Sequence, residues 1–276
     1  RERAEQYFKS GTISLNAFNL SDDRKRSFYH MCRWGRPKLI IGYVSAVREF
    51  AHYLKERGLN IPSLKGVVLC AETVTEETQS YLNRIFRAPS YNAYGGRELS
   101  LIAMECPEHH GLHEISENNF VEFEPIDLAG IQGAGNLIIT NLNNHAMPFI
   151  RYRIGDIGIQ GALPDCPCGR GLPRISKVIG RTTEILEFYD GTKIAGEMFI
   201  HLMKDFPLKQ YQFIQKSDRL ISLRYPIGDL LDQGIREKIV DTYKNYLPGN
   251  VAITFDPVDH LDKTPTGKFR FVLKQP

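Results

Sequence analysis

The first third of the chain alternates short apolar runs with amphipathic segments, and this alternation limits the possible folds most strongly. Residues 38–42 and 67–70 predict short buried strands, and the apolar spacing in residues 44–57 and 75–86 predicts a helix after each strand. Thr75 stands where an N-cap belongs. Because strands separated by helices pair in parallel, this region is expected to form a parallel sheet covered by helices.

The pattern changes after residue 100. Residues 100–180 alternate polar and apolar side chains between glycine-rich turns, which predicts a region of mainly β structure. After Gly180-Arg181 the expected order is strand, helix, two strands, helix, strand. The chain is therefore predicted to be an α/β protein with a domain boundary at this point: residues 1–180 form part of a large domain, and residues 181–276 form a small α+β domain.

The composition is that of a globular protein, with 276 residues of which 42% are hydrophobic and 24% charged. The net charge is +3 and the basic residues are scattered, so nucleic acid is not an expected partner, whereas small anionic ligands suit the charge. No apolar run approaches the roughly 20 residues needed to span a membrane, and no signal peptide is visible. A cytoplasmic location is expected.

One lysine near the end of the sequence stands out because of its setting. Pro265 and Gly267 predict a turn that presents Lys268 on a short loop. Taken alone, such a turn is most often a solvated surface loop. Three further segments precede it in a characteristic order: Tyr94-Gly95-Gly96-Arg97-Glu98, then Arg151-Tyr152-Arg153-Ile154-Gly155-Asp156, then Gly180-Arg181.

In this order the four segments resemble the adenylate-forming superfamily of acyl-CoA ligases, peptide-synthetase adenylation domains and luciferases. The resemblance is strongest to the phenylacetate-CoA ligase-like branch, which includes relatives from capsular polysaccharide biosynthesis. It runs from about Pro37 to the end of the chain and rests also on residues 42–46, 92–98, 148–156 and 166–170. It implies that residues 1–180 are the C-terminal portion of the large AMP-binding domain and that residues 181–276 are its small lid domain.

The resemblance assigns nucleotide contacts to two segments. It implies that Tyr94 stacks on adenine, that Asn92 contacts the amino edge of the base and that Glu98 binds Mg²⁺. Arg97 departs from the superfamily, which usually has Thr or Ser there against the α-phosphate; an arginine could contact phosphate as a charged fork or exclude substrate. The alternative for this segment is a plain turn with a core tyrosine. The remaining expected nucleotide-binding residues are Ala71, Glu72, Ala93 and Gly95.

A carboxylate accepts two hydrogen bonds and so suits the two vicinal hydroxyls of a ribose. By resemblance, Asp156 has this role. The arginines at 151 and 153 could instead be partners in structural ion pairs, and this interpretation is preferred for Arg151.

The resemblance also implies a hinge and a catalytic lysine. Gly180-Arg181 corresponds to the family's hinge, with Arg181 near the ribose; Thr183 and Glu184 stand where the family often has Asp. Lys268 corresponds to the adenylation lysine, whose ammonium offsets the repulsion between a carboxylate and the α-phosphate. In the family the lid then rotates, and CoA attacks the acyl-adenylate. The expected catalytic residues are therefore Lys268 and Glu98.

Three of the five cysteines could hold a metal ion. Cys106, Cys166 and Cys168 together with one histidine make a full tetrahedral set of soft ligands, and His113 is preferred over His110 as the fourth. Related proteins of the branch carry a similar cluster, so a structural Zn²⁺ is expected. A filled site leaves no open position for catalysis. The alternative is three unrelated loop cysteines.

These residues predict ATP-dependent adenylation of a carboxylic acid followed by transfer to CoA, with ATP or AMP, Mg²⁺, CoA and Zn²⁺ as cofactors. Aryl acids suit the branch, whereas a sugar-linked or carrier-bound acid suits the capsule relatives. The expected partners are the small-molecule acid, the nucleotide and a second copy in a homodimer. No Ser/Thr/Gly-rich phosphate loop occurs in the sequence, so the chain is expected to be the C-terminal part of a longer protein. Two alternatives are a non-catalytic, zinc-stabilised AMP-binding module and a scaffold in polysaccharide assembly.

Overall fold

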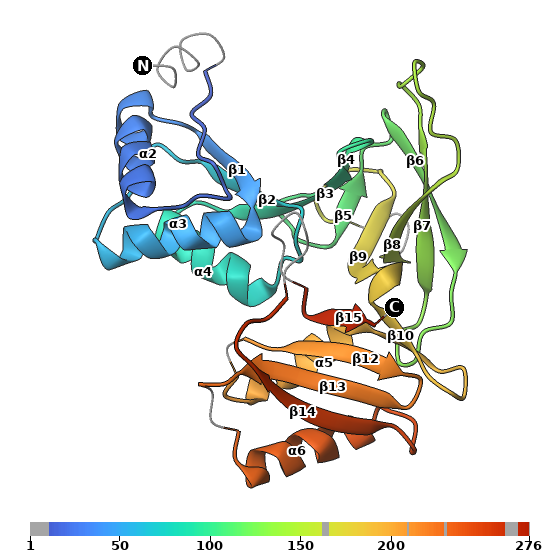
Figure 1. Cartoon of the computed structure of the whole chain (residues 1–276). Coiled ribbons are helices and arrows are strands. Elements are labelled where there is room, and N and C mark those ends of the chain that lie inside the picture. The colour runs from blue at the N-terminus through green and yellow to red at the C-terminus, as the bar shows by residue number, and fades with distance from the viewer. Residues whose placement is uncertain (1–10, 162–165, 209, 229–230, 263–269, 276) are drawn as a thin grey trace. The chain divides into compact units, whose positions relative to one another are not determined.

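The computed structural model describes residues 11–161, 166–208, 210–228, 231–262 and 270–275 (Figure 1). Residue contacts group the chain into two compact units. The first comprises Arg1–Val121, Thr140–Ile150 and Gly161–Lys177, and the second comprises Glu122–Ile139, Arg151–Gln160 and Val178–Pro276. The boundary expected between residues 180 and 181 stays a prediction. Among the described helices, none is both long enough and apolar enough to cross a membrane.

Parallel strands begin the sheet of the first unit, as the alternation of strands and helices predicted. Strands β1 to β3 pair in parallel, and β3 then pairs with β4 in the antiparallel sense, as β4 does with β5 and β5 with the first residues of β9. The strand bounds are β1 Leu39–Tyr43, β2 Gly66–Cys70, β3 Ser90–Gly96, β4 Ser100–Glu105, β5 Leu112–Glu114 and β9 Arg174–Arg181.

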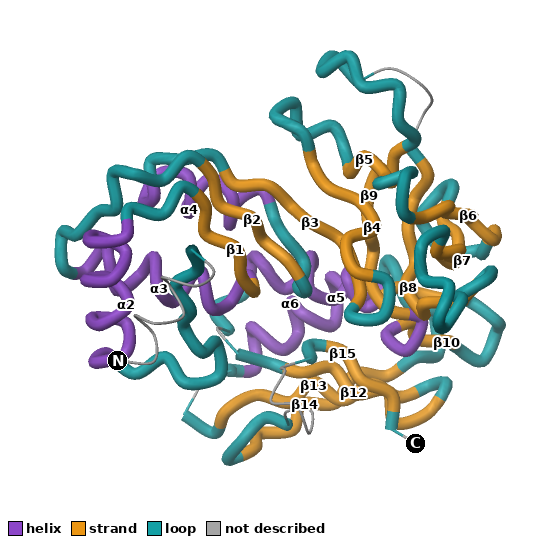
Figure 2. The backbone as a smooth tube through the Cα atoms, turned by 90° about the horizontal axis from the view of Figure 1, so that it is seen from above, coloured by secondary structure: helices purple, strands orange, loops and turns teal. Residues whose placement is uncertain are grey.

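Three helices of the first unit, labelled α2, α3 and α4 in Figure 2, share a buried core with the parallel strand β2. In α3, Val47, Phe50, Ala51 and Leu54 repeat at helical spacing and are buried in a shared core with β2. The hydroxyl of Thr75 accepts a hydrogen bond from the Thr78 amide at 3.2 Å, as expected of an N-cap. The helix bounds are α2 Asp22–Gly35, α3 Val44–Glu56 and α4 Glu76–Phe86.

The prediction that residues 38–42 form a buried strand is wrong in one respect. The strand exists, but the side chains of Leu39 and Ile41 are 54% and 69% exposed, whereas Ile40 packs against the helical core. Strand β1 is an edge strand of its sheet. Successive side chains point to opposite faces of a strand, so only the face shared with α3 is covered within the described part of the chain. An apolar run cannot report which of its faces is covered.

The second unit contains most of β6 (Asn119–Pro125), β7 (Ala134–Asn141) and β8 (Tyr152–Gln160) together with the end of β9. The sheet order there is β9-β8-β7-β6, and β7 pairs with β8 in the antiparallel sense. Buried side chains on these strands form a small core, among them Ala134, Ile157 and Ile179. These strands and β4 and β5 confirm that residues 100–180 are mainly β structure.

The end of the chain forms a four-stranded sheet with the order β14-β13-β12-β15. Strands β10 and β11 form an antiparallel hairpin around Asp190-Gly191, and the two predicted helices are present as α5 and α6. Strand β15 was not predicted; it is three residues long and pairs in parallel with β12. The bounds are β10 Ile185–Glu187, β11 Lys193–Ala195, α5 Gly196–Leu202, β12 Gln212–Ser217, β13 Leu220–Pro226, α6 Gln233–Lys244, β14 Ala252–Val258 and β15 Val272–Lys274.

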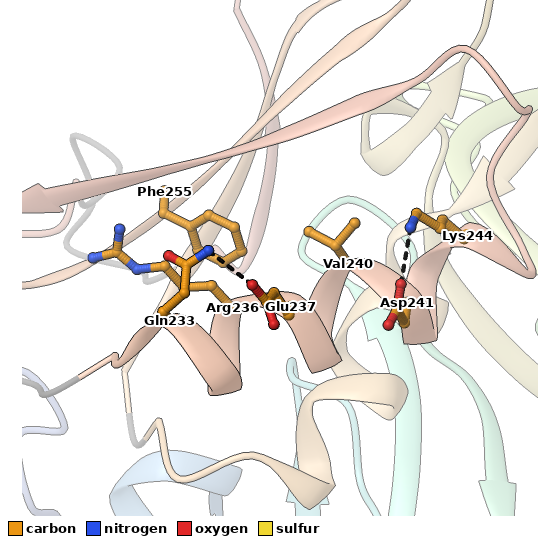
Figure 3. A pocket seen from close by; sticks show the side chains of 7 residues that line it. All are labelled: Gln233, Arg236, Glu237, Val240, Asp241, Lys244 and Phe255. Carbon is orange, nitrogen blue, oxygen red and sulfur yellow. Dashed lines mark hydrogen bonds and ion pairs between the residues drawn. The ribbon is translucent and has the colours of Figure 1, made fainter.

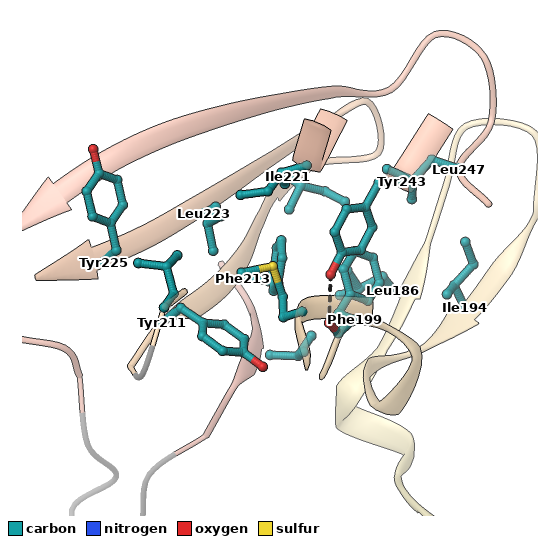
Figure 4. Close-up of a cluster of buried hydrophobic side chains, with 14 of the residues drawn as sticks. Leu186, Ile194, Phe199, Tyr211, Phe213, Ile221, Leu223, Tyr225, Tyr243 and Leu247 are labelled. Atoms are coloured by element: carbon teal, nitrogen blue, oxygen red, sulfur yellow. Dashed lines mark hydrogen bonds between the residues drawn. The ribbon is translucent and has the colours of Figure 1, made fainter. Parts of the chain in front are cut away.

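An aromatic core stabilises this C-terminal sheet (Figure 4). The rings of Phe199, Phe213 and Tyr243 lie with centroids 5.0 to 5.4 Å apart, a separation typical of favourable aromatic pairs. Burial raises the pKa of the Tyr243 phenol, and its hydroxyl donates to the Phe199 carbonyl at 2.6 Å. The strands and helices of the two units together confirm the mixed α/β fold class predicted from the sequence.

Candidate functional site

The structure places several of the predicted nucleotide residues at one edge of the parallel strands. Tyr43, Cys70 and Ala93 lie at the same level in β1, β2 and β3. The residues that follow them, including Ala71-Glu72 and Tyr94-Gly95, therefore share the carboxyl-terminal edge. In open α/β sheets this edge is where ligands bind.

Glu72 has a structural partner at this edge. Its carboxylate accepts from the amide of Ser45 at 2.6 Å and from the Ser45 hydroxyl at 2.8 Å, and thereby caps the first turn of α3. The preceding Ala71 has a φ of 65°, in the left-handed region that non-glycine residues seldom adopt. Glu72 thus fixes the loop after β2 to the helix that follows β1, and Ala71 carries backbone strain between them.

The glycines of the Tyr94 motif, Gly95 and Gly96, lie inside β3. The register of β3 against β4 shifts between Tyr94 and Gly95. A Cβ at Gly95 would lie 2.2 Å from the Ser100 carbonyl oxygen, so only glycine fits this bulge. Close approach of the two strands explains Gly95, and Arg97 and Glu98 stand exposed in the turn that joins β3 to β4.

Glu105 holds the start of this motif and was not identified from the sequence. Its Oε2 accepts from the Asn92 amide at 2.7 Å, from Gln79 Nε2 at 2.8 Å and from His109 Nδ1 at 3.2 Å. Its side chain is 12% exposed. The only signal in the sequence was its position directly before Cys106, which gives no indication of this contact.

The four predicted zinc ligands come together in the first unit. The ligand atoms of Cys106, His113, Cys166 and Cys168 all lie within 4.8 Å of one another. Cys106 Sγ is 3.5 Å from Cys166 Sγ, and Cys168 Sγ is 3.4 Å from His113 Nε2. His110 is exposed and is not part of this group. The set contains three thiols and one imidazole, and three of the four residues are buried.

The geometry fits a tetrahedral ion. Bonds of about 2.3 Å to sulfur and about 2.0 Å to nitrogen place ligand atoms roughly 3.5 to 3.8 Å apart, close to the Cys106–Cys166 and Cys168–His113 distances of 3.5 and 3.4 Å. The Arg170 amide lowers the pKa of the Cys168 thiol to about 7, and burial lowers the pKa of His113. Both shifts favour the forms that bind metal. His113 Nδ1 is buried and has no hydrogen-bond partner of good geometry among the described residues. The Leu172 backbone carbonyl lies near the ring and opposes the lowering of the His113 pKa.

A second group of predicted residues lies in the second unit. Asp156 is on β8 with its side chain 13% exposed, and one of its carboxylate oxygens is 3.5 Å from Arg181 Nε at the end of β9. The next residue, Thr182, donates its hydroxyl to the Gly155 carbonyl at 3.2 Å. The chain therefore brings the predicted ribose carboxylate and the predicted hinge arginine into contact, and the arginine itself remains 60% exposed.

Glu184 completes this second group. It belongs to the 3₁₀ turn Thr182–Glu184, and burial raises the pKa of its carboxyl, while the Arg181 amide and the charges of Arg270 and Arg181 oppose the rise. Gly180 has a φ of 151°, which favours glycine, and a Cβ there would lie 3.3 Å from Glu184 Oε2. The sequence assigned a hinge to this place, and that role stays a prediction.

The arginines at 151 and 153 pair with acids of the same unit. Arg151 Nε lies 3.2 Å from Glu122, and an Arg153 guanidinium nitrogen lies 2.8 Å from Glu124. The side chains of both arginines are more than half exposed, so these pairs contribute little to stability. The structure agrees with the ion-pair interpretation that the sequence favoured for Arg151.

Lys268 lies outside the described residues, but both flanks of its segment are described. The amide nitrogen of Gln212 donates to the carbonyls of Asp262 at 2.7 Å and of Arg270 at 2.9 Å, and its oxygen accepts from the Asp262 amide at 2.9 Å. Gln212 is fully buried on β12. A single side chain thus joins the two flanks of the segment. The sequence gave no signal for it, since a glutamine in an alternating strand is usually surface-exposed.

A shallow groove of about 390 Å³ lies between α6 and β14, on the second unit (Figure 3). Its charged side chains are largely paired within the groove, as with Lys244 and Asp241 at 2.9 Å. It contains none of the residues predicted to bind a ligand. Its lining is Gln233, Arg236, Glu237, Val240, Asp241, Lys244 and Phe255.

Comparisons with known sequences point in the same direction as the motifs. The chain is 22% identical over 274 residues to protein CapK of Staphylococcus aureus, covering 95% of this chain and 58% of that protein. It is 30% identical over 162 residues to phenylacetate-coenzyme A ligase of Thermus thermophilus, covering 55% of this chain and 36% of that ligase. The chain thus spans less than two thirds of the length of these relatives. No family model matches it.

Solved structures share the fold. A 2-hydroxyisobutyryl-CoA ligase in an open conformation superposes with a TM-score of 0.65 at 15% identity, covering 93% of this chain and 60% of that one. O-succinylbenzoate coenzyme A synthetase from Bacillus subtilis, in complex with AMP, gives a TM-score of 0.63 at 14% identity, covering 91% of this chain and 52% of that one. The sequence and fold comparisons together confirm the predicted resemblance to the adenylate-forming superfamily and to its phenylacetate-CoA ligase-like branch.

Proposed function

We propose that this chain of the adenylate-forming superfamily provides the nucleotide-binding residues and the lid of an ATP-dependent acid–CoA ligase. The observation that carries the proposal is the common level of Tyr43, Cys70 and Ala93, which puts the Ala71 and Tyr94 segments at one carboxyl-terminal edge of parallel strands. Of the two sequence relatives described, one is a phenylacetate-coenzyme A ligase.

In the proposed reaction, a carboxylate attacks the α-phosphate of ATP and CoA then takes the acyl group. Tyr94 and Asn92 would bind adenine, Asp156 would bind the ribose hydroxyls and Glu98 would hold Mg²⁺. Lys268 would stabilise the charge that develops as the two anions approach. The partly buried Asp156 supports its part in the proposal, because it lies beside Arg181 and a carboxylate can accept hydrogen bonds from two hydroxyls.

The Cys/His cluster is proposed to hold a structural Zn²⁺. Three thiols and an imidazole at tetrahedral distances leave no position for a substrate, so the ion would join the segments that carry Cys106, His113 and Cys166. The acid remains a choice between the two classes that the relatives suggest: an aryl acid, as the name phenylacetate-coenzyme A ligase indicates, or the sugar-linked or carrier-bound acid that the resemblance to capsule proteins suggests.

Calorimetric titration of this chain with AMP and with 2′-deoxy-AMP tests the proposal. Wild type should bind AMP more tightly than 2′-deoxy-AMP, because only AMP offers the 2′-hydroxyl to Asp156. Asp156→Asn should bind AMP about 10- to 100-fold more weakly, since a hydrogen bond to a charged group is lost, and should no longer distinguish the two nucleotides. Asp127→Asn removes an exposed carboxylate of the same unit and should change neither affinity.

Two outcomes would count against the proposal. One is a wild-type chain that binds neither nucleotide. The other is an Asp156→Asn variant that still prefers AMP by the wild-type factor, which would remove Asp156 from the ribose site.

A further inference from the structure

We propose that Glu105 and His109 couple the Cys/His cluster to the nucleotide motif, so that an ion in the cluster sets the position of the Asn92 backbone. The consequence for AMP affinity rests on the function proposed above for Asn92. The structural part of the inference rests on contacts within the first unit alone.

Glu105 replaces a main-chain partner of β3. The ladder between β3 and β4 begins with Ala93 opposite Met104. The next amide of β3, that of Asn92, donates to the Glu105 carboxylate at 2.7 Å. A side chain therefore fixes the strand at the residue expected to contact the adenine, and a carboxylate makes a stronger bond to an amide than a carbonyl does.

The same carboxylate oxygen, Glu105 Oε2, accepts two further hydrogen bonds from residues of different elements. Gln79 on α4 donates at 2.8 Å and also reaches the Ser90 carbonyl at 3.3 Å, at the start of β3. His109 lies 3.2 Å from Glu105 and comes from the turn after β4. Helix, strand and turn thus meet at one oxygen atom of Glu105. Its side chain is only 12% exposed, and hydrogen bonds are stronger in such a shielded position than in solvent.

The turn after β4 connects this network to the cluster. It begins at Cys106, a cluster residue that directly follows Glu105, and the His109 amide closes it by donating to the Cys106 carbonyl at 3.1 Å. The ring of His109 stacks on Tyr91 with centroids 5.5 Å apart and planes 11° from parallel. Tyr91 is the residue before Asn92, so the turn touches β3 through both a stacked ring and a carboxylate.

An ion in the cluster would restrain this turn at both ends. Cys106 precedes it, and His113 follows it four residues after His109. The residues between them, from Pro107 to His110, are all exposed. With the ion removed, the turn loses the restraint at its two ends and keeps the contacts of Glu105 and His109 and the hydrogen bond from Arg174 Nη1 to the His110 carbonyl at 2.6 Å. Local opening should then release the Asn92 amide.

Hydrogen exchange at the Asn92 amide tests the coupling, on the full chain loaded with Zn²⁺ and on the same chain after chelation. We expect chelation to speed exchange on the order of tenfold or more in wild type, as for a lost hydrogen bond to a charged group. Glu105→Ala should exchange fast with or without Zn²⁺. Glu105→Gln, which keeps one acceptor oxygen, should lie between them. Glu108→Gln neutralises an exposed acid of the same turn and should behave as wild type.

AMP titration of the same samples supplies the second readout. Wild type should lose about tenfold in AMP affinity on chelation, and Glu105→Ala should be weak in both states, because the coupling is already broken. The inference is overturned if chelation leaves Asn92 exchange unchanged, or if Glu105→Ala responds to chelation as fully as wild type. If Asn92 exchange follows Zn²⁺ and Glu105 while no sample binds AMP, the coupling stands and the proposed nucleotide function fails for this chain.

Discussion

Two segments that carry predicted site residues are each held by one polar side chain, and the two side chains differ in charge. Glu105 holds Asn92 in the first unit and is a carboxyl group with 12% of its side chain exposed. Gln212 holds the flanks of the Lys268 segment in the second unit and is a fully buried neutral amide.

The difference follows from burial. A charge taken fully out of water carries a large desolvation penalty, which an amide avoids if its donors and acceptor are all bonded. Gln212 meets this condition, because its nitrogen donates twice and its oxygen accepts once. Glu105 keeps some contact with water and has three donors on one oxygen. In these two cases, both side chains hold a chain segment by hydrogen bonds, and the degree of burial decides whether the residue is charged or neutral.

Removal of the metal should have the largest effect, and it should affect the Glu105 region but not the Gln212 region. If Cys106, Cys166, Cys168 and His113 hold Zn²⁺, chelation should lower the melting temperature by about 10 °C. Hydrogen exchange should rise around residues 104–114 and stay unchanged in β12 and β13. Elemental analysis before and after chelation gives the metal content. A chain that contains no metal and melts unchanged would remove the cluster from this comparison.

Gln212→Leu should have the next largest effect. The leucine fills similar volume but leaves the Asp262 amide and two carbonyls without their partner, at a cost of about 2 to 3 kcal/mol in the free energy of unfolding. Urea denaturation measures this loss, and exchange of the Asp262 amide locates it. Gln210→Leu makes the same change at an exposed position two residues earlier and should stay within about 0.5 kcal/mol of wild type. Equal stability of the two variants would show that Gln212 does not hold the flanks.

Glu184 offers a smaller test of the rule about charge and burial. Its pKa is raised by burial above the ordinary glutamate value of 4.5. Above that pH the unfolded chain has lost the proton while the folded chain keeps it, so the free energy of unfolding should fall as pH rises through the window between the ordinary and the raised pKa.

Glu184→Gln should remove this part of the pH dependence, and denaturation midpoints from about pH 4 to 7 would record it. Glu187→Gln alters an exposed carboxyl three residues later and should leave the dependence as it is. A slope that persists unchanged in Glu184→Gln would assign the titration to another group.

The elements that short-range patterns predict were found close to their expected bounds. The helices at 44–57 and 75–86 follow from apolar spacing and a cap, and they are present as α3 and α4. The short strand β15 was missed because three residues are too few to show a period. The exposed face of β1 was missed because Leu39 and Ile41 are apolar whichever way they point.

Motifs identified the predicted site residues, but they could not predict which residues contact one another. The four cluster residues were identified by residue type and spacing, and the structure brings their ligand atoms together. Glu105 and Gln212 belong to no motif and occur among many similar residues, so nothing local marks them. Gly95 was assigned to ligand approach, whereas the nearby Ser100 carbonyl gives the reason for a glycine there.

The sequence by itself determined the local elements, the family resemblance and the set of possible ligands, because these depend on residue type and on separations of a few positions along the chain. The tertiary structure decided which faces are covered, that Asp156 meets Arg181, and that one carboxylate and one amide hold the predicted site segments. These depend on contacts between residues 13 to 58 positions apart. Such contacts are set by how strands pair and how deeply each side chain is buried, and no local pattern of residues records either.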